Sequence, residues 1–135
     1  MRFEANTLIP LFTGVFFSIL FLQSGLDKVF NWKSEEEFNK KHFEKTFLKA
    51  TVPLMLAVLT LMEISTGLLS VVGLFVMWIT GETAILFYGN LLAATTFLAL
   101  FFGQRISKDY GGAQSLVSYF IVSLIAIYFS FPALP

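Results

Sequence analysis

Hydrophobic residues occur along this chain in long runs that short polar segments interrupt. At about 1.5 Å of rise per residue, a helix of about 20 residues crosses the roughly 30 Å hydrocarbon core of a bilayer. Four runs are long enough, and we expect membrane spans at about residues 7–27, 53–79, 83–103 and 113–131. The pattern predicts an all-α fold, an integral membrane four-helix bundle that forms a single domain over residues 1–135.

The boundaries of these runs carry their own signals. The first run follows Arg2 and resembles a signal peptide, but it continues to Leu26 without an A-x-A-like cleavage site, so we interpret it as a retained first helix. Pro53 suits the first turn of the second span. Gly81 is free to take the left-handed conformation that ends helices, which predicts a tight turn before the third span.

The segment between the first two spans is the most hydrophilic part of the chain. We predict an amphipathic helix over about residues 35–51, because Phe43 and Phe47 lie at helical spacing with Phe38 roughly on the same side. Such a helix would lie along the membrane surface. The alternative is a solvated linker helix that only connects two spans.

Composition supports a membrane protein and excludes several other classes. The chain is 56% hydrophobic and only 13% charged, which is too apolar for a soluble domain of this length. The formal net charge is zero and no basic patch is present, so nucleic acid is not an expected partner. There is no cysteine, which excludes disulfides and thiolate metal sites, and the single His42 sits among charged residues, where we expect it to be solvated rather than to bind a metal.

Loop charge predicts the orientation of the bundle. The side that holds loops 27–52 and 104–112 carries eight of the nine Lys and Arg residues, and the other side carries only Arg2. The positive-inside rule then places both loops in the cytoplasm and both termini outside.

One carboxylate, Glu63, lies inside the second span. A charged group near the centre of a membrane helix costs at least about 2.5 kcal/mol, so Glu63 should face protein or water and be paired or protonated. Two interpretations remain open: a group that handles a proton or binds a ligand, and a buried carboxyl that ties helices together by hydrogen bonds.

Other polar residues could reach Glu63 from neighbouring spans. The sequence leaves open which of them pairs with it, although Asn90 could hydrogen-bond Glu63 across helices. The candidate polar cluster around Glu63 comprises Ser18, Gln23, Asn90, Thr95, Tyr119 and Ser123.

Charged residues where spans leave the membrane form a candidate interfacial motif. After Gly25, Asp27 and Lys28 are expected to form an interfacial ion pair, and the alternative is that they line the mouth of a site. Arg105 and Asp109, four residues apart, are expected to pair and shape the last loop. The alternative for Arg105 is to bind an anionic ligand or a lipid headgroup.

Three short motifs follow one another along the chain: Gly25, Leu26, Asp27 and Lys28, then Glu63, Gly67 and Gly73, then Arg105, Ser107 and Asp109. Together these motifs resemble the DoxX family, small four-helix bacterial membrane proteins that include the DoxD subunit of thiosulfate:quinone oxidoreductase. The family's G-x-G-R-x-S-x-D segment corresponds here to residues 103–109, one residue shorter and without its second glycine.

The resemblance implies a multi-pass subunit of the bacterial cytoplasmic membrane that contacts lipids and works with a partner protein, often a redox enzyme. The sequence has no haem ligand pair, metal cluster, phosphate loop or activated nucleophile, so we expect no cofactor in this chain and no autonomous enzyme, with a quinone as the candidate cofactor of the complex. The alternatives are a non-catalytic assembly or cargo factor, or a protein that binds a small lipophilic ligand.

Overall fold

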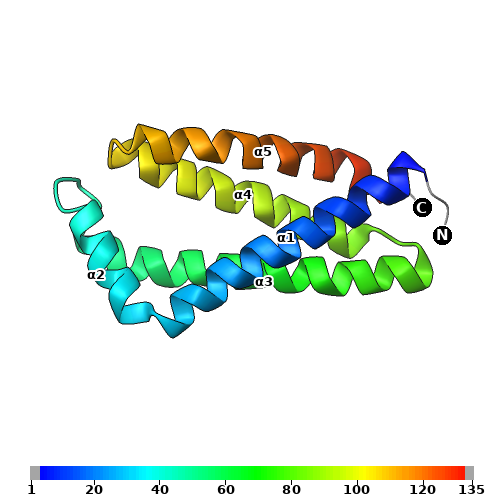
Figure 1. Ribbon diagram of the computed structural model, residues 1–135, viewed down its shortest axis with the longest axis horizontal. Coiled ribbons are helices and arrows are strands. Elements are labelled where there is room, and N and C mark those ends of the chain that lie inside the picture. Colours follow the sequence, from blue (N-terminus) through cyan, green and yellow to red (C-terminus); the bar gives the residue numbers. More distant parts are fainter. Residues whose placement is uncertain (1–3, 133–135) are drawn as a thin grey trace.

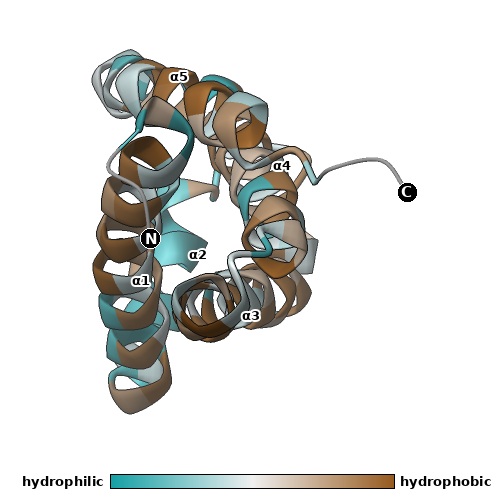
Figure 2. Ribbon diagram, turned by 90° about the vertical axis from the view of Figure 1, so that its right-hand side faces the viewer, coloured by the Kyte–Doolittle hydropathy of each residue, from teal (hydrophilic) through white to brown (hydrophobic). Residues whose placement is uncertain are grey.

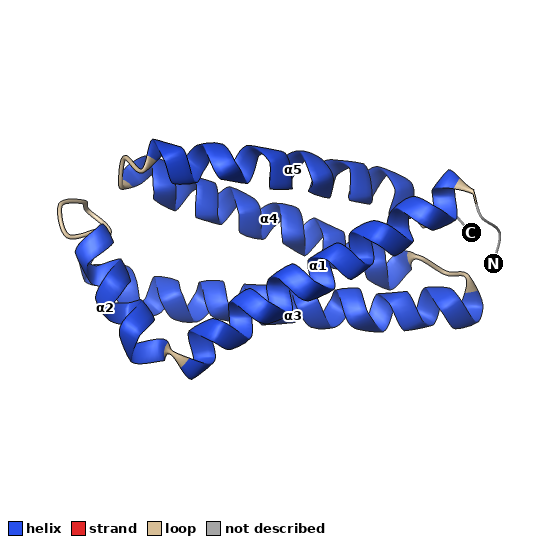
Figure 3. Cartoon of the chain, in the orientation of Figure 1, coloured by secondary structure: helices blue, strands red, loops and turns tan. Residues whose placement is uncertain are grey.

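Helices make up nearly all of the computed structural model, which describes residues 4–132 (Figures 1 and 3). Four helices are long and apolar enough to cross a membrane, so the chain is an all-α, multi-pass membrane helical bundle, as the hydrophobic pattern predicts. Arg2 lies outside the described residues. The elements are α1 (Ala5–Phe30), α2 (Trp32–His42), the short 3₁₀ helix η1 (Lys49–Thr51), α3 (Val52–Thr80), α4 (Ala84–Ile106) and α5 (Tyr110–Ser130).

The start of α1 and the end of α5 lie at one end of the bundle, and α2 lies at the other (Figure 1). We call the end with α2 and the α4–α5 loop the loop side, and the opposite end the terminal side. Figure 2 shows α2 as largely hydrophilic, whereas the long helices are mostly hydrophobic. Gly81 ends α3 with a φ of 80°, in the left-handed conformation that glycine adopts without strain.

The amphipathic helix is shorter than predicted, because α2 ends at His42 rather than near residue 51. The Thr46 hydroxyl donates a hydrogen bond to the Phe43 carbonyl at 2.9 Å and accepts one from the Leu48 N–H at 3.2 Å. Such local bonds compete with the helix ladder and favour a turn. Phe43 is buried, whereas Phe38 and Phe47 are 64% and 73% exposed, so their contact with a bilayer surface stays a prediction.

Glycines let the long helices approach one another closely. A Cβ on Gly67 of α3 would lie 2.7 Å from Cδ2 of Leu22 in α1. A Cβ on Gly73 of α3 would lie 2.8 Å from the backbone nitrogen of Leu86 in α4. Close backbone approach of this kind is how membrane helices gain packing energy, since lipid offers no hydrophobic driving force between them.

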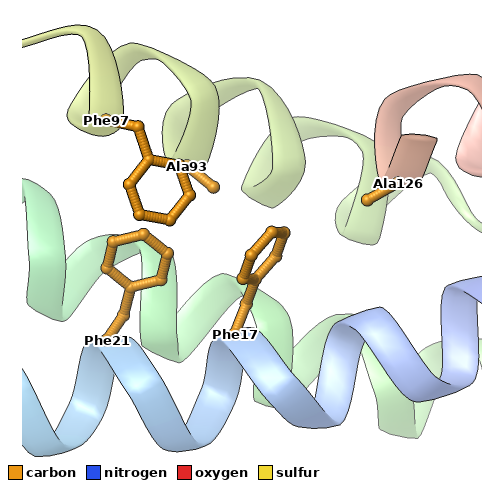
Figure 4. Close-up of a cluster of buried hydrophobic side chains, with 5 residues drawn as sticks. All are labelled: Phe17, Phe21, Ala93, Phe97 and Ala126. Carbon is orange, nitrogen blue, oxygen red and sulfur yellow. The ribbon is translucent and has the colours of Figure 1, made fainter. Parts of the chain in front are cut away.

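An aromatic cluster fills the space between α1, α4 and α5 (Figure 4). The rings of Phe21 and Phe97 have centroids 5.1 Å apart, and Phe17 lies 5.9 Å from Phe97. Tyr119 stacks on Phe97 with centroids 5.7 Å apart. Aromatic side chains therefore fill the interior of the bundle between α1, α4 and α5.

Candidate functional site

The most prominent polar feature inside the bundle is an ion pair between Lys28 of α1 and Glu63 of α3. Lys28 Nζ lies 2.9 Å from Glu63 Oε1, a contact without hydrogen-bond geometry, and it donates a hydrogen bond to Oε2 at 3.3 Å. Nζ also donates to the Ser24 hydroxyl at 3.0 Å. The side chains of Glu63 and Lys28 are 2% and 16% exposed, so the pair is nearly closed to its surroundings.

The crossing of α1 and α3 explains why these two side chains meet. A Cβ on Gly25 would lie 2.6 Å from Cγ1 of Ile64 and 3.5 Å from Cβ of Glu63, so only glycine lets α1 rest on α3 at this point. Lys28 follows Gly25 by three residues and lies on the same face of the helix. Because α1 continues past residue 27 to Phe30, Lys28 is held in a helix that directs it toward Glu63.

The pairing changes what Glu63 can do chemically. A buried carboxylate is costly alone, but a cation within hydrogen-bond reach offsets part of the cost of taking it out of water. Glu63 thus has its counter-charge within the chain, on the helix packed against its own. This geometry favours the interpretation of Glu63 as a link between helices over that of a freely accessible proton carrier.

The predicted polar cluster around Glu63 does not form in the structure. The Ser and Thr hydroxyls of this predicted cluster bond to carbonyls of their own helices, as Ser and Thr commonly do in membrane helices. Thus Ser18 donates to the Gly14 carbonyl at 2.7 Å, Thr95 is exposed and donates to Leu91, and Ser123 donates to Phe120. Gln23 is exposed, and Tyr119 belongs to the aromatic cluster.

Asn90 makes a separate interhelical link. Its side-chain amide donates to the Ala126 carbonyl at 3.2 Å and to the Ser130 hydroxyl at 2.9 Å, both on α5. Asn90 is 1% exposed. It therefore ties α4 to α5 and does not contact Glu63, because its face of α4 meets α5.

The expected Asp27–Lys28 pair is wrong. Adjacent residues on a helix point in different directions. Lys28 points to Glu63, whereas Asp27 accepts a hydrogen bond from the side chain of Asn31 at 3.0 Å. Asp27 is exposed.

The expected Arg105–Asp109 pair is also absent from the described residues. α4 ends at Ile106, and Lys108 has a φ of 62°, so the two residues do not share a continuous helix. Arg105 instead lies over the ring of Tyr110, with its Cζ 4.6 Å from the ring centroid. Asp109 caps α5 by accepting a hydrogen bond from the Gly112 N–H at 3.0 Å.

Sequence reasoning missed a polar junction at His42. His42 Nε2 lies 2.9 Å from Gln104 Oε1 and 2.9 Å from Ser107 Oγ, and 3.9 Å from Asp109 Oδ2. These contacts hold the end of α2 against the end of α4 and the α4–α5 loop. No local pattern identifies them, because the partners are more than 60 residues away in the sequence.

No group of three or more His, Cys, Asp or Glu within residues 4–132 could hold a metal ion. A scan against protein-family models, a search of curated proteins and a search of solved structures each found no match. The class of the protein therefore follows from its own helices, as a multi-pass membrane helical bundle whose candidate site is the Lys28–Glu63 pair.

Proposed function

We propose that this chain is the membrane subunit of a DoxX-type redox complex in the bacterial cytoplasmic membrane, where it anchors and supports a partner protein. The observation that carries the proposal is the Lys28–Glu63 ion pair, which joins two motifs of the resemblance that are 35 residues apart in sequence. The two short motifs that contain Lys28 and Glu63 are thus in direct contact in the folded chain, which supports an architecture shared with the DoxX family.

The reactive groups of the complex would come from the partner. This chain has no cysteine, so thiol or sulfur chemistry needs a sulfur atom supplied by another protein. Its buried carboxylate is already paired with Lys28. A quinone dissolved in the bilayer is the proposed electron acceptor of the complex as a whole.

The loop side offers a surface for a partner. None of the side chains of α2 is buried, and the His42 contacts with Gln104 and Ser107 fix the end of this helix against α4. Lys40 forms an i, i+4 ion pair with Glu36 at 2.9 Å. The hydrogen bond from Lys40 lowers the pKa of Glu36, which favours the charged form of this carboxylate on the surface of α2. The proposed orientation turns this polar surface toward the cytoplasm.

The test is purification of the tagged native protein in a mild detergent, followed by mass spectrometry of the proteins that accompany it and an absorption spectrum. We expect a stoichiometric partner that carries cysteine or a redox cofactor. Glu37→Lys on the exposed face of α2 should weaken its retention, whereas the matched reversal Glu82→Lys on the terminal side should not. A chain that purifies alone, or with a client that lacks redox groups, would contradict the proposal and favour an assembly or cargo factor.

A second function, binding of a small lipophilic molecule, is favoured by one further observation. An apolar groove lies between α2, α3 and α4.

A further inference from the structure

The groove between α2, α3 and α4 lies in the loop-side half of the bundle and has a volume of about 470 Å³. Ligand sites in proteins commonly occupy about 300–1,000 Å³. Its walls are mostly aliphatic and aromatic: α3 supplies Met55, Leu59 and Met62, and α4 supplies Ala99 and Phe102. The methionines add adaptable surface, because their unbranched side chains fit irregular apolar guests.

The groove is open to the hydrocarbon region rather than enclosed. Leu54, Val58 and Phe102 line it and are 68%, 48% and 55% exposed, and all three belong to candidate membrane spans. Lipid chains are the solvent at this depth, so hydrocarbon has direct access to the groove.

The loop-side end of the groove is polar and is bordered by positive charge. Asn39, His42 and Gln104 line this end, and Nδ1 of His42 has no hydrogen-bond partner among the described residues. Residues 41–49 contain three exposed lysines and a single acidic residue, Glu44. These lysines are Lys41, Lys45 and Lys49. In the sequence, Lys41 is next to His42 and Lys49 is next to Leu48, and both neighbours line the groove. None of the three lysines has an ion-pair partner in residues 4–132.

We infer that the groove binds an acyl chain of an anionic phospholipid, whose phosphate lies at the loop side among Lys41, Lys45 and Lys49. An apolar slot that ends at a cluster of cations matches a molecule with a hydrocarbon tail and a negative head. Lysines near a membrane surface attract anionic lipids measurably. An uncharged lipophile, such as a quinone, would use the apolar walls and leave the three lysines without a counter-charge.

This inference concerns lipid binding and is independent of the redox proposal. The experiment is native mass spectrometry and thermal stabilisation of the purified full-length chain with phosphatidylglycerol and phosphatidylcholine of identical acyl chains. We expect phosphatidylglycerol to bind at least about tenfold more tightly, since only its headgroup offers a net charge to the lysines.

Variants separate the head from the tail. Lys41→Gln, Lys45→Gln and Lys49→Gln combined should reduce phosphatidylglycerol binding to the level of phosphatidylcholine. Leu59→Trp, which fills the groove, should weaken the binding of both lipids, and Leu59→Phe serves where the larger ring prevents folding.

Two controls match these changes. The double variant of Lys33 and Lys108 to Gln removes exposed loop-side charge at residues that neither line the groove nor adjoin a lining residue, and Leu124→Trp adds the same ring on an exposed face of α5. Both should bind like the wild type.

Three results would overturn the inference: equal affinity for the two lipids, a phosphatidylglycerol preference that survives the triple variant of Lys41, Lys45 and Lys49, or unchanged binding in both Leu59 variants. Tighter binding of an uncharged quinone analogue in a Leu59-dependent manner would assign the groove to a neutral lipophile instead. Because Leu59 belongs to the span α3 and not to the exposed surface of α2 proposed for the partner, loss of lipid with retention of a copurifying protein would leave the proposed function intact.

Discussion

Replacing Lys28 with methionine tests the buried ion pair most directly. The variant keeps an apolar side chain of similar length but leaves the Glu63 carboxylate, which is 2% exposed, without its counter-charge. Removing one partner of a buried pair costs about 3–5 kcal/mol in soluble proteins. The insertion cost of a charged side chain in a membrane helix gives a similar scale, so we expect about 2.5–3.5 kcal/mol.

The reciprocal change should cost less. Glu63→Gln leaves Lys28, which is 16% exposed and lies near the loop-side end of α1, where its long side chain can extend toward the interface. We expect a loss of about 1–2 kcal/mol for Glu63→Gln, in line with a partly buried charged hydrogen bond. The double variant, which has no buried charge, should be more stable than Lys28→Met alone.

The assay is unfolding by sodium dodecyl sulfate titrated into a mild detergent, followed by far-ultraviolet circular dichroism. The four proteins of the double-mutant cycle give the coupling energy between the two side chains. Lys33→Met on exposed α2 is the matched control, and its stability should stay within about 0.5 kcal/mol of the wild type. Equal stability of Lys28→Met and the wild type, or a coupling energy near zero, would refute the reasoning that this pair links α1 to α3.

Two further predictions concern packing and the loop side. Gly73→Ala should destabilise the bundle by up to about 2 kcal/mol, because a Cβ 2.8 Å from the Leu86 backbone nitrogen costs more than the gain in helix propensity. The control Gly111→Ala places its Cβ no nearer than 3.9 Å to any atom beyond its chain neighbours and its own helix backbone, so in the same sodium dodecyl sulfate titration it should be neutral or stabilising. His42→Ala should speed amide hydrogen exchange across α2, since it removes two contacts that contribute roughly 0.5–1.5 kcal/mol each, and unchanged exchange would show that these contacts do not hold the helix.

The spans could be predicted because their signal is local. Each long apolar run needs only its own length and composition to identify it, and the structure gives four such helices. Pro53 in the first turn of α3 and Gly81 at its C-terminus are equally local, since backbone geometry alone favours them there. The turn after His42 was missed because Thr46 stabilises it through side-chain bonds that compete with a helical pattern.

The partner of Glu63 could not be predicted for a different reason. Hydropathy treats Lys28 as the residue that ends a span, yet α1 continues to Phe30 and carries Lys28 into contact with α3. Only the crossing at Gly25 determines how close the two helices come there. Periodicity shows which residues share a face of one helix, but it does not show where that face meets another helix.

Polar residues in this bundle therefore fall into two groups with different consequences for its structure. Buried hydroxyls such as those of Ser18 and Thr60 donate to carbonyls of their own helix, so these bonds do not link that helix to its neighbour. Other polar residues reach a neighbouring helix instead: Glu63 joins α3 to α1 toward the loop side, and Asn90 joins α4 to α5 toward the terminal side. A shift along the axis of either of these two helix pairs would break its polar contact, so these contacts help to determine a register that apolar packing alone specifies less well.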